Sequence, residues 1–416
     1  MLAFPGLETT HLRQLMIGAT FFVAIGAHVL VVTWLLRAFP RLGRHRRRVI
    51  AACVVLFLTA PIGRLFGVFY WKGLASSFSA AGTSEWMTVM LTSLPLAIIV
   101  LAVRVVMPRV ERALAKRRSK ATPVTPESPD QEAAETAAVL GRRSAIERVA
   151  GLTAFGVSGA ALGWGTFFGR HEFTVEEVIV RLPGLPKVLD GYTIAQISDI
   201  HAGLFVGERE IEEGFSKVRA LRPDLVVATG DLLDFDARFA PWLARKLGDL
   251  RGKDGVFAIL GNHDYYADYR RVMPAMRAGG VDIMLNEGRM IRPGDGGGFA
   301  LLGVDDLWAT RSGGVGPDLD RAIAMVRPDA ARVLLAHQPN FLTTARGKVG
   351  LQLSGHTHGG QINPGFRPAD LIMRYVAGRY EDRGTTLWVN RGFGVAGPPS
   401  RIGAPPEVTK VVLVSA

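Results

Sequence analysis

The sequence contains two closely spaced histidines that could bind a metal ion together. His356 and His358 lie within the glycine-rich stretch 354–360. In an extended chain the side-chain direction repeats every two residues, so two imidazoles at this spacing can point the same way. The flanking glycines permit positive φ angles and a close approach of the backbone to a ligand. A His-x-His pair alone is also typical of surface and core histidines, so its interpretation depends on the other polar residues of the chain.

Further polar residues stand directly after short apolar runs that are predicted to be strands. The clusters are Asp199 with His201, Gly230 with Asp231, Gly261-Asn262-His263-Asp264, His337, and His356 with His358. After His171 the chain contains five more histidines, and all five fall in these clusters. Each residue alone also fits a turn, a helix cap or a buried core position. Histidines without a shared role would be scattered, so we expect the clusters to form one site.

The side chains in these clusters offer oxygen and nitrogen atoms but no thiolate. This donor set suits Mn, Fe, Zn or Co and argues against an iron–sulfur cluster or a structural zinc site. The seven candidate ligands are Asp199, His201, Asp231, Asn262, His337, His356 and His358. This set is too large for one ion but suits two ions that share a carboxylate. Two ions about 3.5–4 Å apart can bridge a hydroxide and neutralise phosphoryl oxygens during in-line attack on phosphorus.

Alternating strands and helices are predicted to position these clusters. Short apolar runs at 192–197, 224–228, 255–260 and 332–336 alternate with stretches of helical spacing such as 208–221 and 267–278. This order favours a layered α/β domain. In such sheets, ligands collect beyond the carboxyl ends of the strands, which is where the polar clusters lie. We therefore expect residues 171–416 to form an α/β domain with a single site.

Residues 1–120 are predicted to form a membrane domain. Three apolar stretches, 15–36, 49–70 and 87–107, have about the 20 residues that a helix needs to cross a bilayer. Basic clusters follow the first and the third stretch, and the positive-inside rule places such clusters in the cytoplasm. The sequence indicates no intramembrane charge pair, which argues against a transport path through the spans.

Residues 121–148 are predicted to be a flexible linker that contains the arginine pair Arg142 and Arg143. The linker is rich in Pro, Glu and Ala and lacks apolar periodicity. We expect the uncharged stretch 149–168 to be a fourth transmembrane or anchor helix. An arginine pair before a mild apolar run also resembles a twin-arginine export signal. Both interpretations place residues after Arg170 outside the cytoplasm, whereas a helix lying along the membrane would leave them inside.

The distribution of charge argues against a nucleic-acid partner. The net charge of the chain is +12, and residues 1–170 contain 20 lysines and arginines against 8 acidic residues, which accounts for all of it. Residues 171–416 are therefore neutral overall and offer no basic track for a phosphate backbone. Cys53 is the only cysteine, so cysteine usage does not decide the compartment.

The polar clusters resemble, in type and in order, the motif set of the calcineurin-like metallophosphoesterases. The resemblance covers about residues 173–416. It implies a four-layer α/β-sandwich, with two mixed sheets flanked by helices. The stretches 197–203, 335–340 and 355–365, with Arg401 and Glu407, further resemble a branch of membrane-anchored or exported bacterial phosphodiesterases. Relatives of that branch cleave the pyrophosphate of UDP-2,3-diacylglucosamine.

The resemblance implies a role for each candidate residue. Asp199, His201 and His358 would bind one metal, and Asn262, His337 and His356 would bind a second. Asp231 would bridge the two. His263 would protonate the leaving-group oxygen or stabilise the phosphoryl charge, and Asp264 would orient His263 by a hydrogen bond.

These features predict a membrane-anchored phosphodiesterase or pyrophosphatase that uses two Mn, Fe or Zn ions. Its substrate would be a small, nucleotide-linked or lipid-linked phosphodiester, with Tyr265, Tyr266 and Trp308 as candidate lining of a lipid-facing entrance. The protein would reside in a bacterial cytoplasmic membrane. The alternative is a membrane sensor or transporter-like protein that binds a phosphorylated ligand through its metal-loaded domain without turnover. His263 favours the enzyme, because binding alone requires no proton donor beside the metals.

Overall fold

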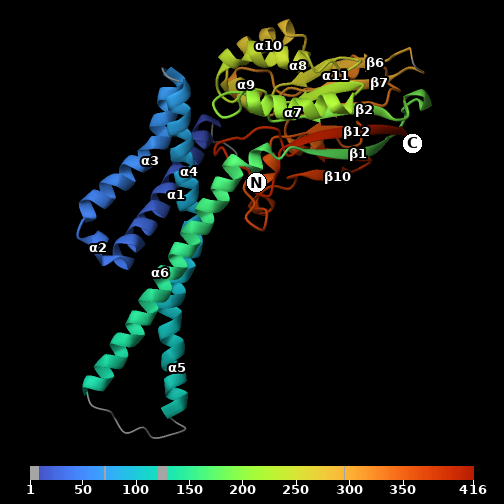
Figure 1. Cartoon of the computed structure of the whole chain (residues 1–416). Helices are drawn as coiled ribbons and strands as arrows, with labels where there is room; N and C mark the ends of the chain where they lie inside the picture. The colour runs from blue at the N-terminus through green and yellow to red at the C-terminus, as the bar shows by residue number, and fades with distance from the viewer. Residues whose placement is uncertain (1–8, 70–71, 120–128, 295) are drawn as a thin grey trace. The chain divides into compact units, whose positions relative to one another are not determined.

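The computed structural model describes residues 9–69, 72–119, 129–294 and 296–416, and it divides into a helical unit and an α/β unit. Figure 1 labels the helices and strands. The helical unit contains, in order, α1 (Thr9–Ala38), α2 (Pro40–Gly43), α3 (Arg46–Phe69), α4 (Lys72–Leu101), a π-helical turn η1 (Ala102–Val106), α5 (Met107–Ser119) and most of α6 (Pro129–Phe167).

Three helical stretches among the described residues are long and apolar enough to cross a membrane. They are Phe21–Ala38, Ser84–Ala113 and Val139–His171. The stretch 49–70 falls mainly on α3, but Tyr70 and several side chains of α3 lie outside the described residues, so this span stays a prediction. The three stretches agree with an α-helical transmembrane region that precedes the α/β domain.

The predicted linker is largely helical, which corrects the prediction for residues 129–148. Helix α6 begins at Pro129 and continues without a break to Phe167. Its first half is rich in Ala, Glu and Arg, which are strong helix formers, and proline is favoured at the first position of a helix. The composition that predicted a linker for residues 129–148 is therefore also typical of a polar helix. Residues 121–128 lie outside the described residues.

Among the described residues, the helical unit contains three pairs of ionisable side chains, His28–Glu85, Arg104–Glu147 and Arg143–Glu111. Glu85 and Glu147 lie just outside the predicted spans 87–107 and 149–168, so the first two pairs each join a residue of a predicted span to one at the edge of another. The buried side chain of His28 lies 2.9 Å from Glu85 (Nε2 to Oε1). Arg104 donates two hydrogen bonds to the buried carboxylate of Glu147, at 2.8 and 2.7 Å. The partners are 57 and 43 residues apart in sequence, and only packing of the helices brings them together.

The α/β unit contains two six-stranded mixed sheets. The first has the order β1-β12-β2-β3-β4-β5, and the second has the order β10-β11-β9-β8-β7-β6. The strands of the first are β1 (Thr174–Leu182), β12 (Glu407–Ser415), β2 (Tyr192–Ile197), β3 (Leu225–Thr229), β4 (Val256–Ile259) and β5 (Asp282–Ile283). Those of the second are β10 (Gly378–Asp382), β11 (Thr385–Val389), β9 (Leu351–Ser354), β8 (Arg332–Leu335), β7 (Phe299–Gly303) and β6 (Glu287–Ile291). Pairing is parallel except between β12 and β2, β10 and β11, and β6 and β7.

The two sheets pack face to face, with helices on their outer faces (Figure 1). One apolar cluster joins both sheets and includes Ile194 of β2 and Leu335 of β8. Because side chains alternate along a strand, Ala195 of β2 points the other way and joins a cluster with the outer helices. These are α7 (Glu208–Leu221), α8 (Ala240–Gly248) and α10 (Tyr269–Ala278), while α11 (Leu319–Ala324) covers the second sheet. The predicted sandwich of two mixed sheets flanked by helices is confirmed.

Candidate metal centre

The carboxyl ends of strands from both sheets meet at one place and bring the predicted ligands together. Asp199 follows β2, Asp231 follows β3 and Asn262 follows β4, at the start of the short helix α9 (Asn262–Tyr266). From the second sheet, His337 follows β8, and His356 follows β9. Segments far apart in sequence are thus in contact, as for His201 and His358, which are 157 residues apart.

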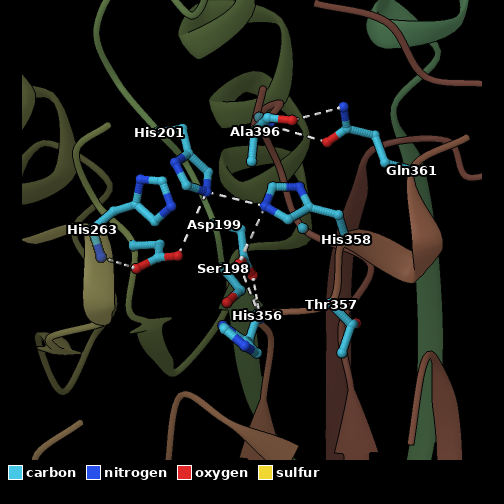
Figure 2. A network of polar contacts seen from close by, with 12 residues as sticks. Ser198, Asp199, His201, His263, His356, Thr357, His358, Gln361 and Ala396 are labelled. Carbon is cyan, nitrogen blue, oxygen red and sulfur yellow. Dashed lines mark hydrogen bonds and ion pairs between the residues drawn. The ribbon is translucent and has the colours of Figure 1, made fainter. Parts of the chain in front are cut away.

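Asp199, His201 and His358 form a first group that could hold a metal ion. Their potential ligand atoms lie within 4.8 Å of one another. The Nε2 atoms of His201 and His358 are 3.0 Å apart, and His358 Nε2 is 3.5 Å from Asp199 Oδ1. Figure 2 shows the two imidazole rings pointing toward each other, with Asp199 beside them. Nitrogen and carboxylate atoms converging in this way match the donor set of a transition-metal site.

Asp231, His337 and His356 form a second such group, and Asp231 is the residue that connects it with the first. Asp231 Oδ2 lies 3.2 Å from His337 Nε2 and 3.6 Å from His201 Nε2. His356 Nδ1 lies 3.3 Å from His337 Nε2. Asp231 is therefore placed between the two groups, as a bridging carboxylate would be.

Asn262 and His337 provide independent tests of whether a metal fits the second group. The Oδ1 atom of Asn262 is buried and has no hydrogen-bond partner among the described residues. A buried amide oxygen without a partner costs free energy, which a metal ion would recover. His337 Nδ1 lies 2.8 Å from the carbonyl oxygen of Thr229 and can donate to it, which leaves Nε2 as the ligand atom. Both observations fit a bound metal.

The backbone is bent sharply at most of the candidate ligands. Five of them have positive φ angles between 49° and 72°: Asp199, His201, Asp231, His356 and His358. Residues other than glycine rarely adopt this left-handed conformation, and its cost is tolerated mainly at functional sites.

Two glycines make room for the carboxylates. A Cβ on Gly355 would lie 2.1 Å from Asp199 Oδ2, and a Cβ on Gly261 would lie 2.2 Å from Asp231 Oδ1. The nitrogen of His356, next to Gly355, donates to Asp199 Oδ1 at 2.9 Å. Any larger side chain at these glycines would therefore displace a candidate ligand.

His263 has a ligand atom within 4.8 Å of those of His201 and Asp231, and a different carboxylate lies beside it than the sequence predicted. Its Nδ1 atom lies 3.1 Å from the carbonyl oxygen of Asp234 and 3.3 Å from Asp234 Oδ1, while its backbone nitrogen donates to Asp231 Oδ1 at 2.8 Å. Burial opposes a charge on the ring, but the Asp231 and Asp234 carboxylates raise the pKa of His263 to about 9. Asp234 also lies 3.6 Å from His201 Nδ1.

Asp264 does not orient His263, which corrects the predicted role. Its buried carboxylate accepts hydrogen bonds from the backbone nitrogens of Gly261, Leu232 and Leu233, at 2.9, 3.2 and 3.0 Å. These bonds tie the loop after β3 to the start of α9. Asp264 therefore holds together the two loops that carry Asp231 and Asn262, and it contributes to the site through the backbone.

Aromatic side chains lie at the edge of the site. Trp308 contacts His356 edge-on, with ring centroids 5.3 Å apart, and Tyr266 contacts His263 at the same centroid distance. Phe235, which is 47% exposed, stacks on Tyr266. Tyr265 is buried instead, and its hydroxyl donates to Asp305, so its predicted place in an entrance was wrong.

Sequence reasoning missed Asp234 and gave no role to Arg401. Asp234 lies three residues after Asp231 in the stretch that follows β3, and this position was the available signal. The fully buried Arg401 donates to the carbonyl oxygens of Gly394, Arg391 and Ala404 and lies 3.2 Å from His358 Nδ1. It positions the segment 391–404 against the first group, and a single arginine in a loop gave no signal of this.

Comparison with known proteins agrees with the geometry of the site. Residues 192–360 match the family model of the calcineurin-like phosphoesterases. The chain is 30% identical over 286 residues to an uncharacterized metallophosphoesterase of Bacillus subtilis, covering 66% of this chain and 98% of that protein. The chain belongs to the calcineurin-like metallophosphoesterase family. Members of this family are phosphoester hydrolases that use divalent metals, and the groups around Asp231 are this metallophosphoesterase's candidate metal ligands.

Other relatives of this metallophosphoesterase contain membrane segments. It is 35% identical over 254 residues to a bovine protein named transmembrane protein with metallophosphoesterase domain, covering 58% of this chain and 57% of that protein. A zebrafish protein of the same name is 34% identical over 251 residues, with shares of 58% and 57%. The chain thus spans little more than half the length of these relatives.

Proposed function

We propose that the chain is a membrane-anchored, metal-dependent phosphodiesterase or pyrophosphatase. The observation that carries the proposal is the shared position of Asp231, whose carboxylate faces both candidate metal groups while His263 stands beside it. In the proposal, residues 171–416 are the catalytic domain, and 15–36, 49–70, 87–107 and 149–168 anchor it.

Each metal would have its own set of ligands. Asp199, His201 and His358 would hold one ion. Asn262, His337 and His356 would hold the other, and Asp231 would contact both. Two Mn, Fe or Zn ions would supply Lewis acidity toward phosphoryl oxygens and an activated water for attack on phosphorus. The left-handed backbone at five of these residues holds the ligand atoms in place before the metals bind.

His263 would give its proton to the oxygen that leaves phosphorus. The carbonyl oxygen of Asp234 accepts from Nδ1, which fixes the ring and leaves Nε2 to face the substrate. Proton transfer from a positioned histidine typically accelerates a reaction by about 10²–10⁴-fold. Asp234 acts as a positioning residue, since it contacts His263 rather than the substrate.

The substrate in this proposal is a small phosphodiester or pyrophosphate, linked to a nucleotide or a lipid. The neutral charge of residues 171–416 speaks against a nucleic acid, and the aromatic rim of Trp308, Tyr266 and Phe235 offers flat surfaces for a base or an acyl chain. UDP-2,3-diacylglucosamine contains both a nucleotide base and acyl chains. The positive-inside rule favours an extracytoplasmic catalytic domain on a bacterial cytoplasmic membrane.

A second candidate is a membrane sensor or transporter-like protein that binds a phosphorylated ligand without hydrolysing it. The pairs His28–Glu85 and Arg104–Glu147 favour this candidate, because ionisable residues within apolar helices commonly have a function. In that case His263 would have no effect on the chemistry of the bound ligand.

The test measures hydrolysis by the full chain in detergent or nanodiscs. The substrates are bis-p-nitrophenyl phosphate, p-nitrophenyl phosphate and a UDP-linked acylated sugar, each with Mn²⁺, Zn²⁺ or chelator. His263→Asn should lower diester turnover about 10²–10⁴-fold with its metals retained. His171→Asn, which removes a histidine paired with Glu213 away from the metal groups, should leave turnover unchanged. Two bound metals and no turnover on any substrate would favour the sensor.

A further inference from the structure

A loop between the candidate metal centre and β10 exposes apolar side chains. We call residues 363–377 the apolar loop. Phe366, Leu371 and Ile372 are 61%, 81% and 80% exposed, and Met373 is 39% exposed. Single exposed apolar residues are ordinary on a protein surface, but four within eight residues, at the tip of one loop, mark an interaction surface.

Hydrogen bonds at both ends of the apolar loop fix it to the domain. Near its start, Asn363 Nδ2 donates to the carbonyl oxygens of Gly359 and Gly403, at 3.0 and 3.1 Å. Near its end, the Thr357 hydroxyl donates to the carbonyl oxygen of Val376 at 2.6 Å. Between these ends the loop contains the short helix η8 (Pro368–Leu371) and borders a hollow of about 570 Å³. The exposed apolar side chains are therefore held on an ordered base.

The base of the apolar loop is connected to the last turns of an apolar helix. The Arg401 nitrogen donates to the carbonyl oxygen of Gly165 in α6 at 3.1 Å. The neighbouring Ile402 exchanges backbone hydrogen bonds with the loop base: its nitrogen donates to Gln361, and its carbonyl oxygen accepts from Asn363, at 2.9 and 2.8 Å. All of these residues belong to the α/β unit.

The end of α6 has the features of a helix that leaves a membrane. It belongs to the apolar stretch Val139–His171, and its Trp164 and Phe167 are 45% and 73% exposed. Exposed aromatic side chains at the end of a spanning helix favour the headgroup level of the bilayer. Because the loop base bonds to this part of α6, the apolar loop lies close to the same level.

A cation adjoins the apolar tip. Arg374 follows Met373, is exposed and lies over the ring of Tyr375, 5.1 Å from its centroid. In the described part of the chain it forms no ion pair. An arginine of this kind can extend toward anionic headgroups while the neighbouring apolar side chains enter the acyl region. The attachment of the loop base to an apolar helix favours a bilayer over a protein partner.

We propose that the apolar loop docks on the surface of a lipid bilayer with anionic headgroups. Leu371 and Ile372 enter the interface, and Arg374 contacts the headgroups. Only Glu172 and Phe173 separate η2 (Gly169–His171) from β1, so the domain is tethered directly to the apolar helix. Docking of the loop then provides a second point of contact, and the two contacts together fix which side of the domain faces the lipid. The inference requires an anchored chain but no catalytic activity.

The experiment measures the depth of a label on the full chain in nanodiscs of phosphatidylcholine and phosphatidylglycerol. Cys53→Ser removes the only cysteine, and Leu371→Cys introduces a site for a nitroxide label. Val188→Cys is the matched control: it is 66% exposed but lies beyond the far end of β1, whose nine residues span about 30 Å. Power saturation by oxygen and by a water-soluble nickel chelate gives the depth of each label.

The proposal predicts a label at 371 about 5–10 Å below the phosphate level, as for other interfacial segments, and a label at 188 in water. Adding Ile372→Ser should move the label at 371 toward water, because less apolar surface remains to insert. A label at 371 as accessible to the chelate as that at 188 would overturn the proposal, and so would insertion at both positions. Neither readout depends on hydrolysis, so failure here and failure of the proposed activity are separate results.

Discussion

Replacing Asp234 with asparagine should slow phosphodiester hydrolysis without unfolding the domain. The substitution keeps the shape of the side chain and removes its charge. Asp234 Oδ1 lies 3.3 Å from His263 Nδ1 and 3.6 Å from His201 Nδ1, so the charge acts on a proposed proton donor and on a candidate ligand at once. The carbonyl oxygen of Asp234 still accepts from His263 in the variant, and the ring therefore stays in place.

In Asp234→Asn, the candidate ligand His201 loses the carboxylate beside its Nδ1 atom. Such losses typically reduce metal affinity or activity about 10–100-fold, which corresponds to about 1.4–2.7 kcal/mol. Asp264→Ala should act differently. Its carboxylate accepts from three buried backbone N–H groups, and unpaired donors cost about 1–3 kcal/mol each, or about 3–9 kcal/mol together. That loss is comparable to the free energy of unfolding of a typical domain, which is about 5–15 kcal/mol.

The assay measures kcat and KM of each variant on bis-p-nitrophenyl phosphate, and the thermal unfolding of the same full-chain samples is followed in parallel. Asp329→Asn serves as the control, because the exposed Asp329 pairs with Arg327 before the start of β8, at the opposite end of that strand from His337. We expect Asp234→Asn to lower kcat/KM with little change in Tm, Asp264→Ala to lower Tm strongly, and the control to change neither. Wild-type kcat/KM in Asp234→Asn, or an unchanged Tm in Asp264→Ala, would refute the division of roles between the two carboxylates.

Three further predictions concern other parts of the chain. Gly355→Ala should lower the bound metal measured by mass spectrometry, because its Cβ would lie 2.1 Å from Asp199 Oδ2; unchanged metal content would contradict this close approach. Although burial opposes it, hydrogen bonds from Lys253 and Thr193 lower the pKa of Asp224 below its ordinary 3.8, so its stabilising contribution is present above that pH and is lost as the pH falls further. Unfolding free energies of wild type and Asp224→Asn should therefore converge in acid, and a constant difference would be evidence against this. Glu85→Gln should lower the stability of the helical unit by about 0.6–1.7 kcal/mol, seen as a lower Tm in detergent; an unchanged Tm would mean that the pair with His28 is not stabilising.

The sequence was most informative where polar residues follow buried strands. Apolar runs of five or six residues predicted β2, β3, β4 and β8 within a few residues, and the polar residues after them lie together in the structure. This was predictable because the carboxyl ends of strands are where loops converge in α/β sheets. The resemblance to a known family then assigned each candidate ligand to one of two groups. Six of the seven lie in the clusters Asp199–His201–His358 and Asp231–His337–His356, and the assignment of ligands to two metals stays a prediction.

The direction of individual side chains was not predictable. His263 and Asp264 are neighbours in sequence, but they lie in the first turn of α9, where consecutive side chains point about 100° apart. Asp264 therefore points to backbone nitrogens, and the carboxylate beside His263 comes from a loop 29 residues earlier. The pair His28–Glu85 was missed for a similar reason, since it depends on how two helices pack.

The most direct test of a two-metal centre is the metal content of the purified full chain. Mass spectrometry on wild type should give about two transition-metal ions per chain, since the proposal divides the ligands into two sets that share Asp231. Asp231→Ala should lose both ions, while Asn262→Ala, which removes a ligand from the second group only, should lose one. A single ion in the wild type, or two ions retained in Asp231→Ala, would contradict the account.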